Sequence, residues 1–495
     1  MRGSSLKQLA VHVSHYSLAS LLTTIAGFIS FPLLTRIFSV GDYGVMSLVA
    51  ASVTIAAAVG KMGVQHSVLR YHSEISAGKR PFTHRQLSST TVLGALGTGL
   101  AAAAVLLAVT GLAPAGTLGD GRVRVLLAIM CVAVVMQVVG SSLVNFTRAE
   151  MRTKLLVIYQ VAKKYAGLGL ILIAVLLVSR TLTAFYLATA LGEALAVVAL
   201  ALVLFRRGGL PRPRLAEFSP ALFKEMLRFG IPMMVGYELS GIVLAVGDRY
   251  VIEALIGPEP LGLYAAAYNM CEYVQLVFIS SVGQAIMPIY MKTWDENGRE
   301  ATSAFIDQSL RSYALFGVPV VAGVAAVGSE LLPALASSKY AAAGAVIPWV
   351  VAGMVVDGAN AMVGAGLFIE RRTRRIMAII MSCAALNIGL NLVLVPRLGI
   401  VGSALATLVS YSATAVLLAV FGRRFLAVTL PWPTLARAGA ASLLMYLVVT
   451  GLFGGHGLLT VAVRAATGAA LYAVVMWAID ADARALVRKA LPLAG

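Results

Sequence analysis

Residues 182–205 read LTAFYLATALGEALAVVALALVLF and are followed at 206–214 by the basic segment RRGGLPRPR. The first stretch is long enough to cross the roughly 30 Å hydrocarbon core of a bilayer as an α-helix. Its single ionisable residue is Glu193. A strand of a membrane β-barrel would instead be short and would alternate apolar and polar residues. This stretch therefore predicts a membrane-spanning helix that ends at a basic surface segment.

The same pattern recurs along the chain. Of the 495 residues, 59% are hydrophobic and 12% are charged, whereas a soluble domain carries about 25% charged residues. This composition excludes a soluble globular protein and a disordered chain, and three cysteines in apolar runs exclude a disulfide scaffold. The sequence predicts an all-α polytopic membrane protein. Fourteen apolar segments are the candidate spans, at about 13–36, 41–62, 86–110, 123–146, 155–178, 182–205, 230–256, 261–288, 306–328, 341–369, 374–396, 399–421, 435–454 and 459–479.

The placement of charge predicts the orientation of these spans. The chain carries 39 Lys and Arg against 21 Asp and Glu, a net charge of +18. With the N-terminus in the cytoplasm, 29 of the 39 cations fall on inner segments and 7 on outer segments. Because short basic loops stay on the cytoplasmic side, both termini are expected inside. The basic clusters then serve as topology determinants near anionic membrane lipids, with no role in binding nucleic acid.

Arg2 and Lys7 precede the first apolar run, and no small-residue cleavage site follows it. That run is therefore expected to be a retained span and not a removed signal peptide.

An internal repeat at an offset of 218 residues divides the chain: residues 43–47 align with 261–265, and 187–189 align with 405–407. Each half then has six spans, and an even number of spans makes the halves parallel repeats with a site expected between them. The predicted organisation is an N-terminal six-helix lobe at 1–205, a cytoplasmic amphipathic linker at 206–229, a C-terminal six-helix lobe at 230–424, and two extra helices with a cytoplasmic tail at 425–495.

Ionisable residues inside the spans are the candidate site residues, because charge is costly in hydrocarbon and usually faces a cavity or a partner. Cations in a cavity would bind an anionic headgroup, since Arg can grip a phosphate with two hydrogen bonds. Acids there would neutralise the cations or carry coupling protons. The candidate cations are Arg36, Arg249, Lys163 and Lys164, and the candidate acids are Asp248, Glu238, Glu193, Glu272 and Asp357.

Structural interpretations stand beside these functional ones. Lys163 and Lys164 would snorkel to the inner interface if the fifth span began later than expected. Asp248 and Arg249 would form an internal pair that fixes packing, and Arg36 would be an interfacial anchor.

Other polar and small residues in the spans are expected to join helices. Asn387 and Asn391 are spaced i, i+4 in the eleventh span, which favours hydrogen bonds between helices. Gly399, Gly402 and Ala406 are expected to let helices approach closely.

The signatures of enzymatic chemistry are missing from the sequence. Gly60 and Lys61 lack the glycine spacing and the following Ser or Thr of a phosphate-binding loop. The six histidines and three cysteines show no metal-ligand spacing, and no nucleophile elbow is present. The sequence therefore predicts a protein that is not an enzyme and that needs no cofactor or metal.

Residues 34–39 (LTRIFS) followed by 41–44 (GDYG) resemble the opening signature of the Wzx-type polysaccharide-export flippases. These are the lipid-linked oligosaccharide translocases of the multidrug/oligosaccharidyl-lipid/polysaccharide exporter superfamily. Further matches to the family follow in the same order, over residues 14–421 in all. They are GVQH at 63–66, FGIP at 229–232, DR at 248–249 with GLY at 262–264, and NIGLN at 387–391.

The resemblance implies a V-shaped bundle of two six-helix lobes plus two extra helices, in the inner (plasma) membrane of a bacterium. The implied cargo is an undecaprenyl-diphosphate-linked oligosaccharide repeat unit, moved from the inner to the outer leaflet for O-antigen, exopolysaccharide or another surface polysaccharide. Alternating access driven by an ion gradient is the implied mechanism. The family's cationic cavity maps onto Arg36 and Arg249, while depth alone adds Lys163 or Lys164. The expected partners are this lipid-linked glycan, membrane lipids, and the polymerase and glycosyltransferases of the pathway.

Three alternatives remain at this point. A small-molecule or multidrug cation antiporter is disfavoured because no acid lies between His12 and Arg36, where such extruders often place one. A flippase for peptidoglycan lipid precursors shares the fourteen-helix plan. A non-transporting scaffold for polymer export would tolerate neutralisation of all the intramembrane charges.

Overall fold

The computed structural model describes residues 21–112, 120–206, 210–276, 280–452, 457–480 and 484. Within these residues all the regular elements are helical. Eleven of the described helices are long and apolar enough to cross a membrane, and the helix Leu21–Ile37 is a shorter apolar one. The predicted tail at 1–12, the first residues of the first span and most of the predicted C-terminal tail lie outside the described residues.

The predicted spans correspond to these helices once two long ones are divided. The helix α12 (Ser280–Leu335) is interrupted at Gly298, and α15 (Thr373–Gly422) is interrupted at Gly399. Both glycines have a positive φ, of 76° and 58°, which side chains other than glycine rarely adopt. Each long helix therefore supplies two arms. This confirms the predicted all-α membrane protein with about fourteen spans.

Contacts divide the chain into two compact units, residues 1–254 and 255–495. The seventh predicted span therefore packs with the first six. The predicted boundaries of the lobes, the linker and the extra helices stay predictions. After the helix Leu21–Ile37, the elements of the first unit are α2 (Val40–Lys61), α3 (Val64–Ser76), α4 (His84–Leu112), α5 (Arg122–Ala149), α6 (Thr153–Ile173), η1 (Ala174–Val178), α7 (Leu182–Arg206), η2 (Leu215–Glu217), α8 (Pro220–Met233), η3 (Met234–Leu239), α9 (Ser240–Val246) and α10 (Asp248–Ile256, which ends two residues beyond the boundary).

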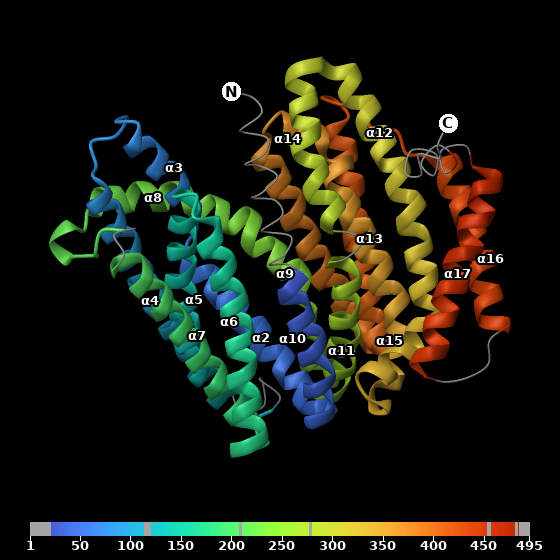
Figure 1. Cartoon of the computed structure of the whole chain (residues 1–495), viewed down its shortest axis with the longest axis horizontal. Coiled ribbons are helices and arrows are strands. Elements are labelled where there is room, and N and C mark those ends of the chain that lie inside the picture. Colours follow the sequence, from blue (N-terminus) through green and yellow to red (C-terminus); the bar gives the residue numbers. More distant parts are fainter. Residues whose placement is uncertain are drawn as a thin grey trace. The chain divides into compact units, whose positions relative to one another are not determined.

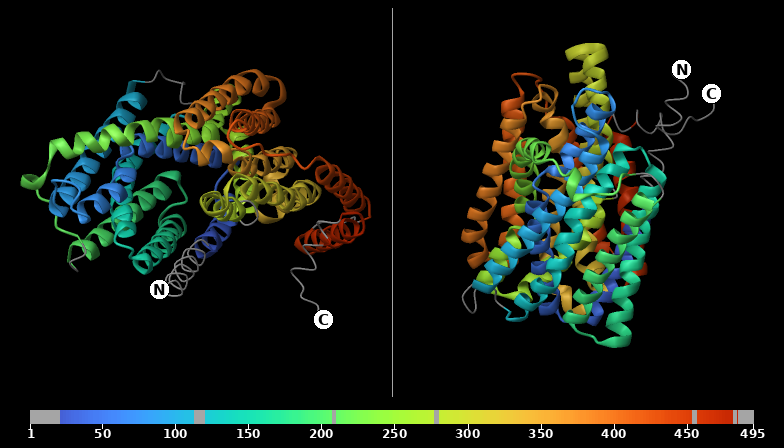
Figure 2. Two further views of the ribbon diagram at one scale, coloured as in Figure 1. Left: turned by 90° about the horizontal axis from the view of Figure 1, so that it is seen from above. Right: turned by 90° about the vertical axis from the view of Figure 1, so that its left-hand side faces the viewer.

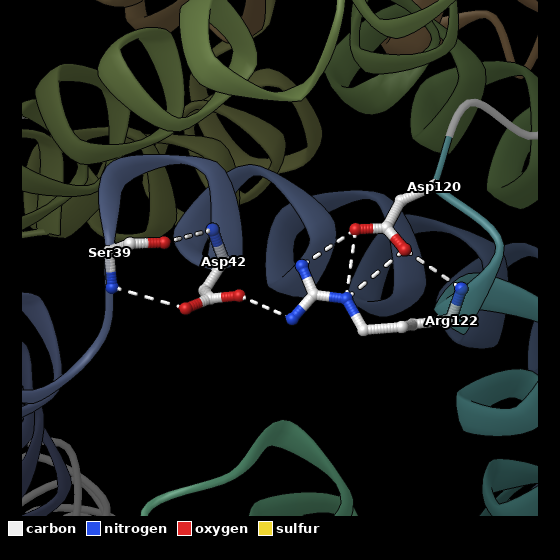
Figure 3. A network of polar contacts seen from close by, with 4 residues as sticks. All are labelled: Ser39, Asp42, Asp120 and Arg122. Atoms are coloured by element: carbon white, nitrogen blue, oxygen red, sulfur yellow. Dashed lines mark hydrogen bonds and ion pairs between the residues drawn. The ribbon is translucent and has the colours of Figure 1, made fainter.

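A network of polar contacts fixes the start of α2 (Figure 3). Asp42 N donates to Ser39 Oγ at 3.0 Å, and Ser39 N donates to Asp42 Oδ2 at 3.2 Å, which together form a capping box. Arg122, at the start of α5, donates to Asp42 at 2.7 Å and to Asp120 at 2.6 Å. The hydrogen bonds from Arg122 lower the pKa of the Asp120 carboxyl. The GDYG motif thus includes the residue that joins α2 to α5.

The helix α8 lies crosswise over the ends of α3 and α4 (Figure 1). Its backbone meets the turn before α3 so closely that a Cβ atom on Gly63 would lie 2.0 Å from Gly230 O. Gly63 also has a φ of 70°, so both the close contact and the backbone conformation require glycine at this position. Ser67 Oγ then donates to Met226 O at 3.0 Å. The predicted amphipathic linker therefore ends in a helix that is packed into the first unit.

The second unit contains the remaining helices. They are α11 (Pro258–Val274), α12, η5 (Ser338–Val346), α13 (Ile347–Val363), α14 (Ala365–Ile369), α15, α16 (Trp432–Leu452) and α17 (Leu458–Ile479). Both α16 and α17 pack beside α12 (Figure 2). Arg464 on α17 donates to Glu330 on α12 at 2.5 Å, and both side chains are largely buried. An ion pair within the membrane-spanning part of this unit thus joins α17 to α12.

The two arms of α15 are joined by the predicted asparagine. Asn387 Nδ2 donates to Thr407 Oγ1 at 3.4 Å across the arms, and Asn391 Nδ2 donates to Asn387 O at 2.9 Å. A Cβ atom on Gly402 would lie 2.4 Å from Leu394 O, which confirms the expected close approach there. The expectation for Gly399 was wrong, because a Cβ atom there would meet nothing within 4 Å. Its positive φ at the break is what requires glycine.

Candidate functional site

The first unit contains a polar pocket of about 900 Å³. Its wall is built from the helix Leu21–Ile37 and from α2, α3, α5, α6, α7 and η3. Four Lys and Arg side chains line it against two carboxylates, with several amides and hydroxyls between them. Its charged lining residues are Lys61, His66, Arg148, Lys163, Lys164, Glu193 and Glu238, and its uncharged polar ones are Thr23, Ser30, Gln65, Gln137, Ser141, Asn145, Tyr159, Gln160 and Thr189.

Glu238 is the centre of one cluster in this pocket. Its carboxylate accepts a hydrogen bond from Lys61 Nζ at 3.1 Å and another from Gln65 Nε2 at 2.6 Å, and His66 Nε2 lies 3.5 Å away. Glu238 stands in the π-helical turn η3, which follows Pro232 in α8. Such turns shift the helical register and are frequent at functional sites. The cluster therefore links α8–η3 to the turn between α2 and α3.

A second cluster lies on α6 and α7. Lys163 Nζ donates to Glu193 Oε1 at 2.5 Å, and the Glu193 side chain is 12% exposed against 35% for Lys163. Lys163 also lies 6.0 Å from the centre of the Tyr159 ring, a distance at which a cation and an aromatic ring attract each other. The pair satisfies the carboxylate in the middle of α7. It also leaves the lysine partly accessible from the pocket.

The remaining two cations have no carboxylate partner in the described part of the chain. Lys164 is exposed on α6, and the Arg148 guanidinium at the end of α5 has only Asn145 Oδ1 within reach, at 3.5 Å. With Lys61 and Lys163 matched by the two glutamates, Lys164 and Arg148 give the pocket an excess of positive charge. An open polar cavity with excess cations binds anions.

The uncharged lining offers hydrogen bonds to a polar ligand. Gln65 Oε1 is buried without a partner among the described residues. Gln137, Gln160 and Tyr159 add further donors and acceptors along α5 and α6. Groups of this kind match the hydroxyls of a sugar.

Four of the nine predicted site residues meet at this pocket: Lys163, Lys164, Glu193 and Glu238. Arg36 does not line it, although it is exposed near the end of the helix that contributes Leu34 to the wall.

Arg249 and Asp248 lie elsewhere in the first unit. Arg249 is buried and donates from Nε to Ser47 Oγ at 3.0 Å and from Nη1 to Ala245 O at 2.8 Å, with Asp248 Oδ1 at 3.4 Å. These contacts join α10 to α2, as the packing interpretation expects. Whether either residue also takes part in transport stays a prediction.

Glu272 and Asp357 belong to the second unit. Glu272 is exposed on α11, and Asp357 accepts a hydrogen bond from Asn360 Nδ2 at 2.9 Å within α13. The structure brings neither residue into the pocket of the first unit. Their roles also stay predictions.

Lys61, His66 and Arg148 also line the pocket but were not predicted from the sequence. Lys61 and His66 lie at the end of α2 and the start of α3, where a basic residue looks like an ordinary inner-loop charge. The available signal was their position, two residues before and three residues after the Gly63 of the GVQH motif. Arg148 ends α5 and carried the same inner-loop interpretation.

The fold matches solved membrane transporters. The lipid II flippase MurJ in an inward closed conformation superimposes with a TM-score of 0.77, over 96% of this chain and 99% of that one, at 14% identity. An inward-facing multidrug resistance MATE transporter of the MOP superfamily gives 0.65 over 83% of this chain and 97% of that one, at 15% identity. The chain therefore shares the fold of these two transporters.

Two family models match the sequence. The model described as polysaccharide biosynthesis protein matches residues 9–294, and the model of the lipid II flippase MurJ matches residues 165–475. The chain belongs to the polysaccharide biosynthesis protein family, as the resemblance of its motifs predicted, and is a multi-pass membrane protein.

A curated relative is the probable low-salt glycan biosynthesis flippase Agl15 of Haloferax volcanii. It is 22% identical over 244 residues, which are 48% of this chain and 51% of the relative. The match thus spans about half the length of that protein.

Proposed function

We propose that this protein moves polyprenyl-diphosphate-linked oligosaccharides across the membrane, with the pocket of the first unit receiving the headgroup. The observation that carries the proposal is the excess of cations in this pocket. Lys164 and Arg148 have no carboxylate partner among the described residues and face an open hollow. A diphosphate that links a lipid to a sugar carries one negative charge on each phosphate. Two such charges match the two unmatched cations.

The size and the uncharged lining of the pocket support a sugar-bearing headgroup. A pocket of about 900 Å³ accommodates more than a diphosphate alone. The amides of Gln65, Gln137 and Gln160 provide the donors and acceptors that sugar hydroxyls require. A charged headgroup cannot cross hydrocarbon unassisted, so a polar path must be supplied by the protein.

Glu193 and Glu238 link proton binding to anion binding in this proposal. Each carboxylate is bound to a lysine in the ligand-free pocket. A diphosphate held by Lys164 and Arg148 also attracts these paired lysines, which makes each glutamate a better proton acceptor. Proton uptake by the glutamates would then accompany binding of the anion. In this proposal the protein lies in a bacterial inner membrane and its cargo is a repeat unit of O-antigen or exopolysaccharide. Its partners are the polymerase and glycosyltransferases of the same pathway.

Binding to the purified protein tests the proposal. The probe is a water-soluble short-chain prenyl-diphosphate sugar, titrated against full-length protein in detergent. Lys164→Gln and Arg148→Gln should each raise the Kd about tenfold, a loss of roughly 1.4 kcal/mol. Lys154→Gln is the matched control, because Lys154 is an exposed cation on α6 outside the pocket. Equal Kd values for wild type and both pocket variants would remove the pocket from the mechanism.

A second candidate is a flippase for peptidoglycan lipid precursors, which the MurJ model favours through its match to residues 165–475. Both cargos carry a polyprenyl diphosphate, so the charged pocket fits either. Depletion of this protein in its native host distinguishes the two candidate cargos. Loss of surface polysaccharide with normal peptidoglycan supports the first proposal, whereas accumulation of the peptidoglycan precursor supports the second.

A further inference from the structure

The second unit contains a separate pocket of about 540 Å³, built entirely from the two ends of α15 and the turn after it. The break at Gly399 folds α15 back on itself, which brings its first and last turns together. The lining residues are Arg375, Ala378, Ile379, Ser382, Leu417, Val420, Phe421, Arg423 and Arg424. None of them belongs to the pocket of the first unit.

The two arms contribute the same spacing. Residues 375, 378, 379 and 382 follow i, i+3, i+4, i+7 on the first arm, and residues 417, 420 and 421 follow i, i+3, i+4 on the second. This spacing puts each set on one face of a helix. Arg375 stands at the outermost position of the first face, and Arg423 and Arg424 lie in the turn that follows the second. The pocket therefore has a basic mouth at the ends of α15 and mainly apolar walls that lead inward.

The arginines at the mouth are not neutralised by the protein. In the described part of the chain, the guanidinium groups of Arg375, Arg423 and Arg424 take part in no salt bridge, and no carboxylate lines the pocket. Three like charges around one hollow repel each other. A phosphate relieves that repulsion, because each guanidinium can donate two hydrogen bonds to its oxygens.

The walls suit a hydrocarbon chain. Val420 and Phe421 are 43% and 46% exposed, and Ala378 is also exposed. On a membrane-spanning helix these side chains face the acyl chains of the bilayer. A molecule that has both a phosphate and an acyl chain would fill the mouth and the walls together.

We propose that this pocket binds one anionic phospholipid, with its phosphate among Arg375, Arg423 and Arg424 and an acyl chain against Leu417, Val420 and Phe421. The charge pattern of the sequence puts these arginines on the cytoplasmic side, where anionic lipids gather around basic segments. Basic pockets between transmembrane helices on that side recognise lipid headgroups in the same way. The site takes resident lipid of the bilayer and is independent of the proposed transport cargo.

Native mass spectrometry of the purified full-length protein tests the site. The probe is phosphatidylglycerol added in defined amounts, with phosphatidylcholine as the uncharged comparison. The pocket variant is Arg375→Gln with Arg424→Gln. The matched control is Arg371→Gln with Arg374→Gln, because both of these arginines are exposed at the start of α15 and line no part of the pocket. The two variants lose the same charge.

The pocket variant should lose one retained phosphatidylglycerol, with a fall of at least about fivefold in the lipid-bound fraction, roughly 1 kcal/mol. The control should retain it. Equal retention by the two variants, or equal loss, would overturn the proposal, since equal loss means that net charge alone attracts the lipid. Strong binding of phosphatidylcholine at the same site would overturn the anionic assignment.

A second experiment distinguishes a bound lipid from bound free phosphate. Phe421→Ser keeps the three arginines and removes an apolar wall residue, so it should lower phosphatidylglycerol retention without creating any affinity for inorganic phosphate. If inorganic phosphate displaces the lipid at millimolar concentration and Phe421→Ser has no effect, the ligand is a free phosphate and the lipid proposal is overturned.

Discussion

At the scale of single residues, the pocket of the first unit is defined by which cations find a carboxylate and which do not. Glu193 binds Lys163 and Glu238 binds Lys61, while Lys164 and Arg148 are left without one in the described residues. Lys163, Lys164, Glu193 and Glu238, which the sequence places within spans, all line this pocket. Arg249, which the matched motifs suggested, lies outside this pocket and donates to Ser47 and Ala245.

The Lys163–Glu193 pair predicts a specific pattern of stability. Lys163→Gln leaves a largely buried carboxylate without its partner and should lower the thermal stability of the purified protein. Lys163→Gln with Glu193→Gln should be less destabilised than the sum of the single variants, with a coupling of about 1 to 3 kcal/mol. Differential scanning fluorimetry of the four proteins measures it. Strict additivity would show that the pair has no energetic role.

The close contact and positive φ of Gly63 predict that its substitution lowers the stability of the protein. Gly63→Ala forces a Cβ atom into Gly230 O and keeps a φ of 70° that alanine disfavours. The loss of stability should be at least about 2 kcal/mol. Gly97→Ala is the control, because a Cβ atom there meets nothing within 4 Å in the helix α4 and alanine favours the helix. A Gly63→Ala protein as stable as wild type would mean that α8 does not cross α3 at this point.

At the scale of helices, the sequence predicted the spans well because burial in a bilayer leaves long apolar runs. It predicted their contacts less well. The face that a helix such as α5 turns inward is set by its neighbours, so Gln137 and Asn145 could not be assigned to the pocket. The sequence around the two glycines that interrupt α12 and α15 does not show whether a glycine is needed for a change of backbone direction or for close packing of helices. Gly399 was misinterpreted for this reason.

The pair between Arg464 and Glu330 predicts how the extra helices are held. Arg464→Leu leaves Glu330 largely buried without this partner and should destabilise the packing of α17 on α12 by about 3 kcal/mol. Limited proteolysis should then cleave near α16 and α17 first. The exchange Arg464→Glu with Glu330→Arg should restore part of the resistance. Wild-type resistance in Arg464→Leu would contradict a structural role for the pair.

At the scale of the whole molecule, the charge pattern predicts the orientation in the membrane. The native cysteines are all buried, so a cysteine introduced in an exposed loop is the accessible one. In intact cells, a membrane-impermeant maleimide should label Ser179→Cys, in a predicted outer loop, and should label Lys79→Cys only after permeabilisation. Both native positions are exposed. The reverse pattern of labelling would contradict the predicted orientation of the spans.

The sequence predicted the class of the molecule and its family, because the motifs stand in order along the chain. The cargo is the part that composition and periodicity leave open. A diphosphate and an acidic sugar both call for cations, and the fold of the chain is shared by proteins with different cargos. Lys61, His66 and Arg148 are distant in sequence from the lysines of α6. Only the folded structure shows that they line the same pocket.

Flipping in proteoliposomes is the most direct test of the central claim. The protein is reconstituted with an undecaprenyl-diphosphate-linked oligosaccharide, and outward appearance of the glycan is followed with a membrane-impermeant glycosidase under an imposed proton gradient. Arg148→Gln with Lys164→Gln should slow the appearance at least about a hundredfold, roughly 2.7 kcal/mol, while Lys154→Gln should match wild type. A double variant that flips the glycan at the wild-type rate would contradict the account.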